Sequence, residues 1–222
     1  MKPDPMPGLM PVFPLANVVF FPHTNLNLHI FEPRYKEMVA DLLTGDRWLA
    51  VALIDDEQES EDVSAPAFHP VAGAGRIGRY TKLPDGRFNI VVEGLERVVL
   101  SEVASERAYR MVEATPLPED LTWISGQEGE EVLNRLVIVA GRLGLLGTPL
   151  PKKLVPEDAE RRAALVNRLA SAVMAESHER QAFLAAAGYR ERSNLLARQL
   201  RFAQDLSEAL ALYPRPPDPG RN

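Results

Sequence analysis

The sequence predicts an α+β fold, in which a small, partly closed β-barrel with one inserted helix is followed by a group of helices. Between residues 10 and 114, six to eight short apolar segments have strand-like patterns, and one segment has helical spacing. Pro116 and Pro118 then interrupt the pattern, and helical spacing continues to residue 212. We therefore predict a barrel subdomain at 10–118, a helical subdomain at 119–212, and flexible tails at 1–9 and 213–222.

The first part of the predicted barrel contains two strands and the inserted helix. Met10–Leu15 is expected at an edge or a bulge, because its prolines lack the N–H that a central strand donates. Val18–Phe21 is a second apolar segment, and Leu26–Ile30 alternates apolar with polar residues as a half-buried strand does. Pro33 suits the first position of a helix, which Gly45 would end.

The rest of the barrel is predicted as further strands joined by turns. Pro84-Asp-Gly86 indicates a hairpin turn, since proline presets φ and glycine accepts a positive φ. Glu93–Glu96 is interpreted as another turn, and Asp55–Asp62 as an exposed acidic loop. The strands are expected at Trp48–Ile54, Val71–Leu83, Arg87–Val92, Arg97–Val103 and Tyr109–Ala114.

The second half of the chain is predicted to be helical. Ser125-Gly-Gln-Glu128 has the spacing of a capping box, and a stripe of apolar residues follows it as far as Leu143. A proline-containing loop is expected at Gly147–Pro156. Later helices are predicted at Glu157–Ala175, Ser177–Ala187 (with a stop at Gly188) and Arg190–Leu212.

Composition restricts the class of partner. The net charge of −6 argues against a nucleic-acid binder, because such proteins need cations to displace counterions from phosphates. We expect no DNA partner and consider RNA the weaker alternative. The chain has no cysteine, and it contains neither a signal peptide nor an apolar run long enough to cross a membrane. These features favour a cytoplasmic protein with no membrane partner.

No motif predicts a catalytic, cofactor or metal site. Gly73-Ala-Gly75-Arg-Ile-Gly78 matches the dinucleotide pattern G-x-G-x-x-G, but the residues after it continue as a strand where that site needs a helix. No glycine precedes a lysine, which excludes a Walker A loop. The four histidines are scattered without metal-ligand spacing, and no nucleophile elbow is present. We therefore expect no cofactor and no enzymatic activity, with a hydrolase of unrecognised site as one alternative.

A series of short phrases in the front half carries a family resemblance. These are Val12-Phe-Pro-Leu15, Phe20-Phe-Pro22, Leu28-His-Ile-Phe-Glu-Pro-Arg-Tyr35, Met38-Val39, Pro84-Asp-Gly-Arg87 and Glu93-Gly-Leu-Glu-Arg97. In this order they resemble the amino-terminal, substrate-binding domain of Lon proteases, and the resemblance covers about residues 10–210. It implies a PUA-like β pseudo-barrel followed by a helical bundle. The chain is similar to stand-alone members of the family, without ATPase or peptidase modules.

The resemblance implies a non-catalytic module that recognises a protein or an unfolded peptide. RNA binding, known for PUA-like barrels, is the alternative. The candidate partner contacts are Glu32, Arg34, Arg87 and Arg97; we expect the last two at the surface beside turns, and Arg34 to pair with an acid across the barrel. An apolar patch or groove is expected where barrel and helices meet. Most matching apolar residues should be core, namely Phe13, Leu15, Phe20, Leu28, Ile30, Phe31, Tyr35 and Met38.

Overall fold

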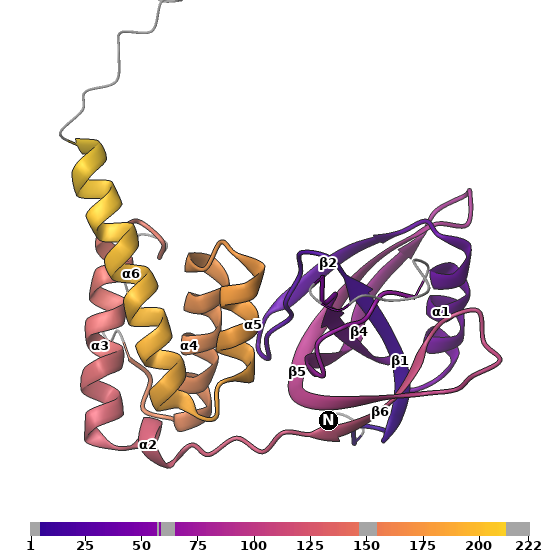
Figure 1. Ribbon diagram of the computed structural model, residues 1–222, viewed down its shortest axis with the longest axis horizontal. Coiled ribbons are helices and arrows are strands. Elements are labelled where there is room, and N and C mark those ends of the chain that lie inside the picture. The colour runs from indigo at the N-terminus through magenta and orange to yellow at the C-terminus, as the bar shows by residue number, and fades with distance from the viewer. Residues whose placement is uncertain (1–4, 57, 59–64, 147–154, 212–222) are drawn as a thin grey trace, which may run out of the picture.

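The fold is α+β, as predicted, with a six-stranded sheet followed by a group of helices (Figure 1). This computed structural model describes residues 5–56, 58, 65–146 and 155–211. Most of the predicted acidic loop, most of the Gly147–Pro156 loop and the tail 213–222 therefore lie outside the described residues.

The six strands form one sheet in the order β2-β5-β4-β3-β1-β6, and a further pairing of β5 with β6 closes five of them into a barrel. Among the described strands, β1 and β3 form the only parallel pair. Within the same residues, β2 pairs with β5 alone, so it forms an edge beside the closed part. The strands are β1 (Leu9–Leu15), β2 (Asn25–Ile30), β3 (Trp48–Leu53), β4 (Val71–Lys82), β5 (Phe88–Val103) and β6 (Met111–Pro116).

The predicted turn at Glu93–Glu96 is wrong, because β5 passes through it as one strand of 16 residues. Two register shifts against β4, between Ala74 and Gly75 and between Ile77 and Arg79, let the strand bend without ending. Its first half pairs with β2 and its second half with β6. A bent, continuous strand is what closes the barrel here.

Glycines of the dinucleotide-like motif allow another segment of backbone to pass close to β4. Gly73 and Gly75 lie inside β4, so the expected strand context is confirmed. A Cβ at Gly73 would overlap the carbonyl oxygen of Phe20, and one at Gly94 would overlap that of Phe21. The apolar segment 18–21 is therefore no strand, but a buried crossing that passes close over the sheet.

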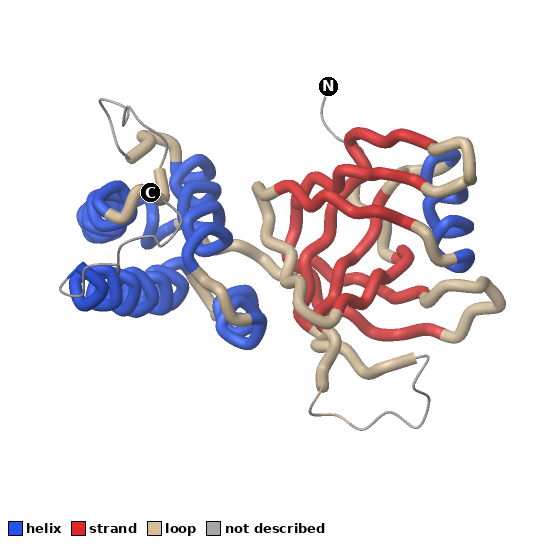
Figure 2. Tube along the Cα trace, turned by 90° about the horizontal axis from the view of Figure 1, so that it is seen from above, coloured by secondary structure: helices blue, strands red, loops and turns tan. Residues whose placement is uncertain are grey.

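Helix α1 (Pro33–Thr44) has proline in its first turn and Gly45 at its C-cap, as predicted. Its buried face packs against the barrel on the side away from the other helices (Figures 1 and 2). Most of the expected core residues lie in that cluster or pack against it, but Phe31 is 60% exposed, so its assignment to the core was wrong. The strand alternation explains this: Ile30 points inward, and the next residue must point outward.

The predicted capping box at Ser125 is not formed. Gly126 occupies the N-cap of α3, and the Ser125 hydroxyl donates to the Thr122 carbonyl oxygen within the preceding short helix. Asp158 does cap α4, accepting a hydrogen bond from the Arg161 backbone N–H at 2.9 Å. The helices are α2 (Thr122–Ser125), α3 (Gln127–Arg142), α4 (Ala159–Val173), α5 (Ser177–Ala185) and α6 (Tyr189–Ala211).

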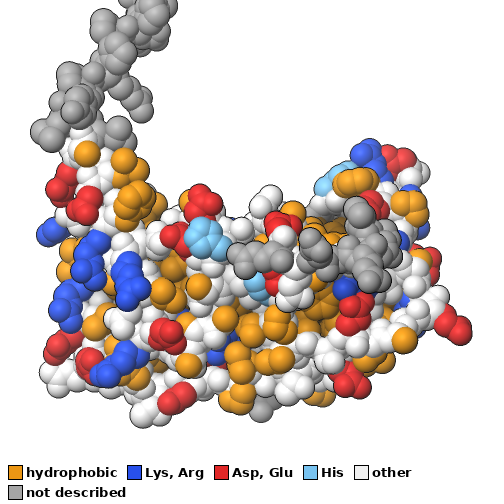
Figure 3. Space-filling model, in the orientation of Figure 1, with side chains coloured by type: hydrophobic (Ala, Val, Ile, Leu, Met, Phe, Trp, Pro, Cys, Tyr) orange, Lys and Arg blue, Asp and Glu red, His pale blue; other side chains and the backbone are white. Residues whose placement is uncertain are grey.

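One apolar cluster joins the barrel to the helices. Val19, Phe21 and Leu53 from the barrel belong to the same core cluster as the inner faces of α3 to α6. The rings of Phe21 and Phe183 lie 5.2 Å apart. On the face drawn in Figure 3 the two parts meet in a continuous surface. Side chains thus fill most of the junction, where an apolar patch or groove was expected.

Candidate functional site

Arg97 lies in the junction between barrel and helices, so the prediction that it sits at the surface is wrong. Its side chain is 1% exposed. The Nε donates to Glu119 Oε1 at 2.7 Å, and one Nη donates to the carbonyl oxygens of Leu184 and Ala186 at 2.6 and 2.9 Å. Those carbonyls end helix α5, where the helix dipole favours a cation. Arg97 therefore connects a barrel strand to a helix end and is not placed to touch a partner.

Arg192 completes this buried ionic group. Its two Nη atoms donate to the two oxygens of Glu119 at 3.1 and 3.0 Å, and its side chain is also 1% exposed. Burial, followed by the charge of Arg192, lowers the pKa of Arg97, while Glu119 opposes the shift. Burial also raises the pKa of Tyr189, which lies under the Arg192 guanidinium. This buried ionic group therefore stabilises the junction between the barrel and the helices.

A hollow of about 370 Å³, lined by both apolar and polar side chains, remains at the edge of the junction. Asp55, His69, Ser177 and His178 line it, which is the residue set that a hydrolase would need. His69 Nδ1 lies 3.9 Å from Asp55 Oδ2, beyond hydrogen-bond distance. No hydrogen bond between Ser177 and either histidine occurs among the described residues. The arrangement does not have the geometry of a catalytic triad.

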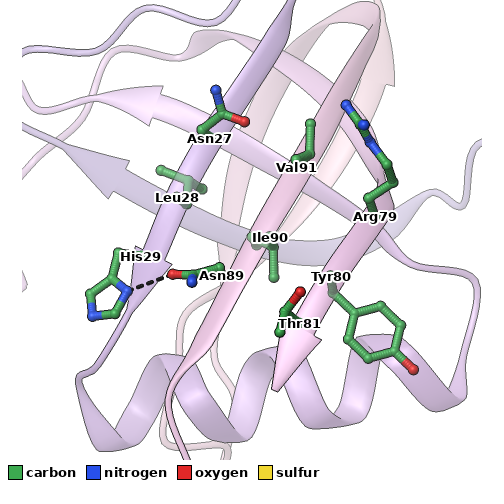
Figure 4. A pocket seen from close by; sticks show the side chains of 9 residues that line it. All are labelled: Asn27, Leu28, His29, Arg79, Tyr80, Thr81, Asn89, Ile90 and Val91. Atoms are coloured by element: carbon green, nitrogen blue, oxygen red, sulfur yellow. Dashed lines mark hydrogen bonds between the residues drawn. The ribbon is translucent and has the colours of Figure 1, made fainter. Parts of the chain in front are cut away.

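A second hollow, of about 600 Å³, lies on the open side of the barrel, and we call its lining the β2–β5–β4 face (Figure 4). Nothing packs over it in the described part of the chain. It carries one arginine, one histidine and no carboxylate, around the half-buried Val91. Its lining residues are Asn27, Leu28, His29, Arg79, Tyr80, Thr81, Asn89, Ile90 and Val91.

A chain of hydrogen bonds orders one end of this face. Arg87 contacts His29 Nε2 at 3.1 Å, and since a guanidinium can only donate, Nε2 must accept. His29 Nδ1 then carries the hydrogen and donates to Asn89 Oδ1 at 2.7 Å. Arg87 also pairs with Asp85 at 2.7 Å, and its backbone N–H is the main cause that lowers the pKa of the Asp85 carboxyl. Arg87 is exposed, as predicted, and it positions His29.

One exposed aromatic side chain borders this face, and a second, Tyr80, projects from the other surface of β4, on the side of its partner Ile90. Phe31 is 60% exposed, and its ring stacks on that of His29 with centroids 6.2 Å apart. Tyr80 is 48% exposed, and the Arg47 guanidinium lies 5.9 Å from the centre of its ring. Aromatic and arginine side chains are the types enriched where proteins recognise other proteins. The sequence analysis singled out neither residue as exposed; for Phe31 a signal existed, because Ile30 and Phe31 are successive apolar residues at the end of an alternating strand, and one of them must face out.

Glu32 and Arg34 lie directly beside Phe31 at the start of α1. Their side chains pair with each other at 3.1 Å and are 42% and 38% exposed. Arg34 thus pairs with a near neighbour in sequence, and its pairing with an acid across the barrel stays a prediction. The Arg34 guanidinium also lies over the Tyr35 ring, and burial raises the pKa of that tyrosine. Of the four candidate contacts, Glu32, Arg34 and Arg87 are at or near the β2–β5–β4 face, and Arg97 is not.

No group of three or more histidine, aspartate or glutamate side chains is arranged to hold a metal ion in the described part of the chain. Among the helices described, none has both the length and the apolar character to cross a membrane.

Comparison with known proteins gives a consistent picture. A family model described as the ATP-dependent protease La (LON) substrate-binding domain matches residues 10–201. The Lon protease of Flavobacterium johnsoniae is 24% identical over 195 residues, which cover 87% of this chain and 24% of that protein. Lon protease 2 of Syntrophobacter fumaroxidans is 27% identical over 184 residues, covering 83% of this chain and 23% of the relative. The chain thus spans about a quarter of the length of these relatives.

A solved structure supports the fold. The crystal structure of a Lon N-terminal domain protein from Xanthomonas campestris superposes with a TM-score of 0.59 at 22% identity. The match covers 85% of this chain and 97% of that one. At this identity the match speaks for the fold, and the barrel and the helices are both included in it.

Proposed function

The chain belongs to the LON substrate-binding domain family, and on that premise we propose that it is a non-catalytic module that binds unfolded protein segments. The observation that carries the proposal is the β2–β5–β4 face. It combines the exposed Phe31 ring, a cationic rim and an edge strand on the outer side of the barrel. Any function together with an ATPase or a peptidase is part of the proposal, because the chain spans only a quarter of its relatives.

The chemistry of the face fits recognition better than catalysis. Phe31 offers an apolar anchor, which unfolded chains can cover with the side chains that native proteins bury. Within the described residues, the Arg79 side chain makes no hydrogen bond or ion pair, so its guanidinium is available to a carboxylate. No acid lines the hollow to oppose an acidic segment. Among the described residues of this face, no general acid or base lies beside a nucleophile.

The test compares binding of a permanently unfolded protein to the wild-type chain and to Phe31→Ser. A phenylalanine side chain contributes roughly 200 Å² of contact surface, so covering the exposed 60% of Phe31 removes about 120 Å² from water. At about 25 cal/mol per Å² this is about 3 kcal/mol. We expect Phe31→Ser to weaken binding by roughly 30- to 150-fold, measured by fluorescence anisotropy of a reduced, carboxymethylated protein.

Phe202→Ser is the matched control. Phe202 is 67% exposed on helix α6, so the same substitution removes a similar apolar surface from the opposite end of the molecule. Binding by this variant should equal that of the wild type. Equal losses in both variants would mean that binding follows general stickiness, and the proposal for this face would then be wrong.

RNA binding is the second candidate function. Exposed Tyr80, with Arg47 beside it and Lys82 two residues further along β4, forms a cationic and aromatic surface of the kind that can stack bases. The net charge of −6 counts against it. Binding of single-stranded RNA that exceeds binding of unfolded protein, and falls steeply with salt, would reverse this ranking.

A further inference from the structure

Strand β2 leaves one edge of the sheet unpaired. Its residues Asn25–Ile30 pair with β5 on one side, and no other described strand pairs with it. Proteins commonly protect such edges with lysine, proline or a charged side chain turned inward. β2 contains none of these. An unprotected edge offers backbone donors and acceptors to another extended chain.

The hairpin between β4 and β5 determines which residues of β5 direct their backbone N–H and C=O groups toward β2. Leu83 N–H donates to the Arg87 carbonyl oxygen at 2.8 Å, which makes these two a hydrogen-bonded pair. Backbone direction alternates along an antiparallel strand. The backbone N–H and C=O groups of Asn89 and Val91 therefore point toward β4. Those of Phe88, Ile90 and Val92 point toward β2.

The register of β2 on β5 then assigns its free backbone groups. Leu28 lies opposite a β5 residue that faces β2, so its N–H and C=O are used within the sheet. Asn27 and His29, one residue to each side, turn their N–H and C=O outward. The other end of the strand follows the same alternation. There the Gly94 N–H donates to the Thr24 carbonyl oxygen at 2.8 Å, so the backbone groups of Thr24 point toward β5, as those of Leu28 do.

The side chains beside this edge define what an added strand would meet. The side chains of Asn27 and His29 are exposed on the outer face, with Arg87 bonded to His29. Leu28 is half-buried on the inner face. Phe31 stands exposed just past the end of the strand. A segment that alternates apolar with polar or acidic residues would match both faces.

We propose that β2 binds an extended segment of an unfolded protein as an additional strand, through the outward backbone groups of Asn27 and His29. This inference rests on the proposed function and names how the substrate is held. Main-chain pairing accepts many sequences, which suits a module that must bind varied unfolded chains.

The charges around the edge favour such a segment over a second copy of this chain. Arg168 donates to the His23 carbonyl oxygen at one end of β2, and Arg87 lies at the other end. Antiparallel pairing of two β2 strands would bring Arg87 of one copy near Arg168 of the other, and like charges opposed across strands are unfavourable. An acidic or neutral peptide has no such conflict.

The experiment follows amide hydrogen exchange of the full chain by NMR, with and without the reduced, carboxymethylated protein. The amides of Asn27 and His29 should exchange rapidly in the free chain and at least about tenfold more slowly when the unfolded protein is bound. The Leu28 amide, already paired with β5, should change little. Binding without slower exchange at Asn27 and His29 would overturn this inference and leave the proposed function standing, whereas absence of binding would overturn the proposed function itself.

A variant pair gives an independent measurement. Asn27→Pro removes an outward N–H, a position at which an edge strand tolerates proline, and should weaken binding about tenfold or more. Asn27→Thr keeps the N–H and should bind as the wild type does. Wild-type affinity in Asn27→Pro would contradict strand addition, and slower exchange that depends on the concentration of the chain alone would show that a second copy occupies the edge.

Discussion

Replacing Arg97 by methionine should destabilise the folded chain much more than the same change at Arg87. The sequence treats the two arginines alike, since each follows a predicted turn. In the structure the Arg97 side chain is 1% exposed and the Arg87 side chain 45% exposed. Methionine keeps most of the length of either side chain, so the comparison isolates the polar contacts.

The expected magnitude follows from the groups that lose a donor. Arg97→Met leaves the carbonyl oxygens of Leu184 and Ala186 without their cationic donor at the end of α5. A hydrogen bond to a charged group contributes about 1.5–3 kcal/mol, and relief of the buried guanidinium offsets part of the loss. Glu119 keeps its two bonds to Arg192. We expect a decrease of about 3 kcal/mol in the free energy of unfolding.

Urea unfolding followed by far-UV circular dichroism measures this difference. A loss of about 3 kcal/mol should also lower the melting temperature by roughly 6–12 °C for a chain of this size. Arg87→Met should be indistinguishable from the wild type, because Arg87 is exposed to solvent. If Arg97→Met costs less than about 1 kcal/mol, or no more than Arg87→Met, the buried ionic group does not hold the two parts together as we infer.

Two further predictions concern packing and pH. Gly75→Ala should destabilise the chain by about 3 kcal/mol in urea unfolding, because its Cβ would overlap the Glu93 carbonyl oxygen. Gly8→Ala is the control, since its Cβ would meet nothing within 4 Å, and it should be neutral. Equal effects of the two substitutions would contradict the close approach of Glu93 to Gly75. Burial, with a hydrogen bond to Asp41, raises the pKa of Tyr109 to about 12, so the folded chain holds this proton more tightly than the unfolded chain, whose tyrosine pKa is near 10. The resulting stability should be present below pH 10 and lost as the pH rises toward 12, and a stability that stays constant over this range while tyrosinate absorbance appears would refute it.

Local sequence patterns predicted the order and type of most elements. Alternation identified β2, the continuous apolar run identified β3, and Pro33 with Gly45 bounded α1. These features depend on residues within a few positions of one another, and steric and hydrogen-bonding preferences act at that range. The division at 118 into two subdomains stays a prediction, although the strands end at Pro116 and the helices begin at Thr122.

Errors arose where a distant segment decides the local outcome. The predicted turn in β5 does not form because Gly94 lets the backbone of Phe21 cross the strand, and β2 and β6 pair with its two halves. The capping box does not form because the Ser125 hydroxyl donates a hydrogen bond within the short helix α2. In each case the local pattern allowed two structures, and packing selected one.

The sequence by itself determined the α+β class, the strand that became the free edge, and the family to which the chain belongs. Only the tertiary structure decided which side chains are available to a partner. Arg97 is buried because its acceptors lie 22, 87 and 89 residues further along the chain, and Phe31 is exposed because nothing packs over the end of β2 in the described structure. A charged side chain can be buried only where partners converge on it in space, and that convergence is a property of the folded chain.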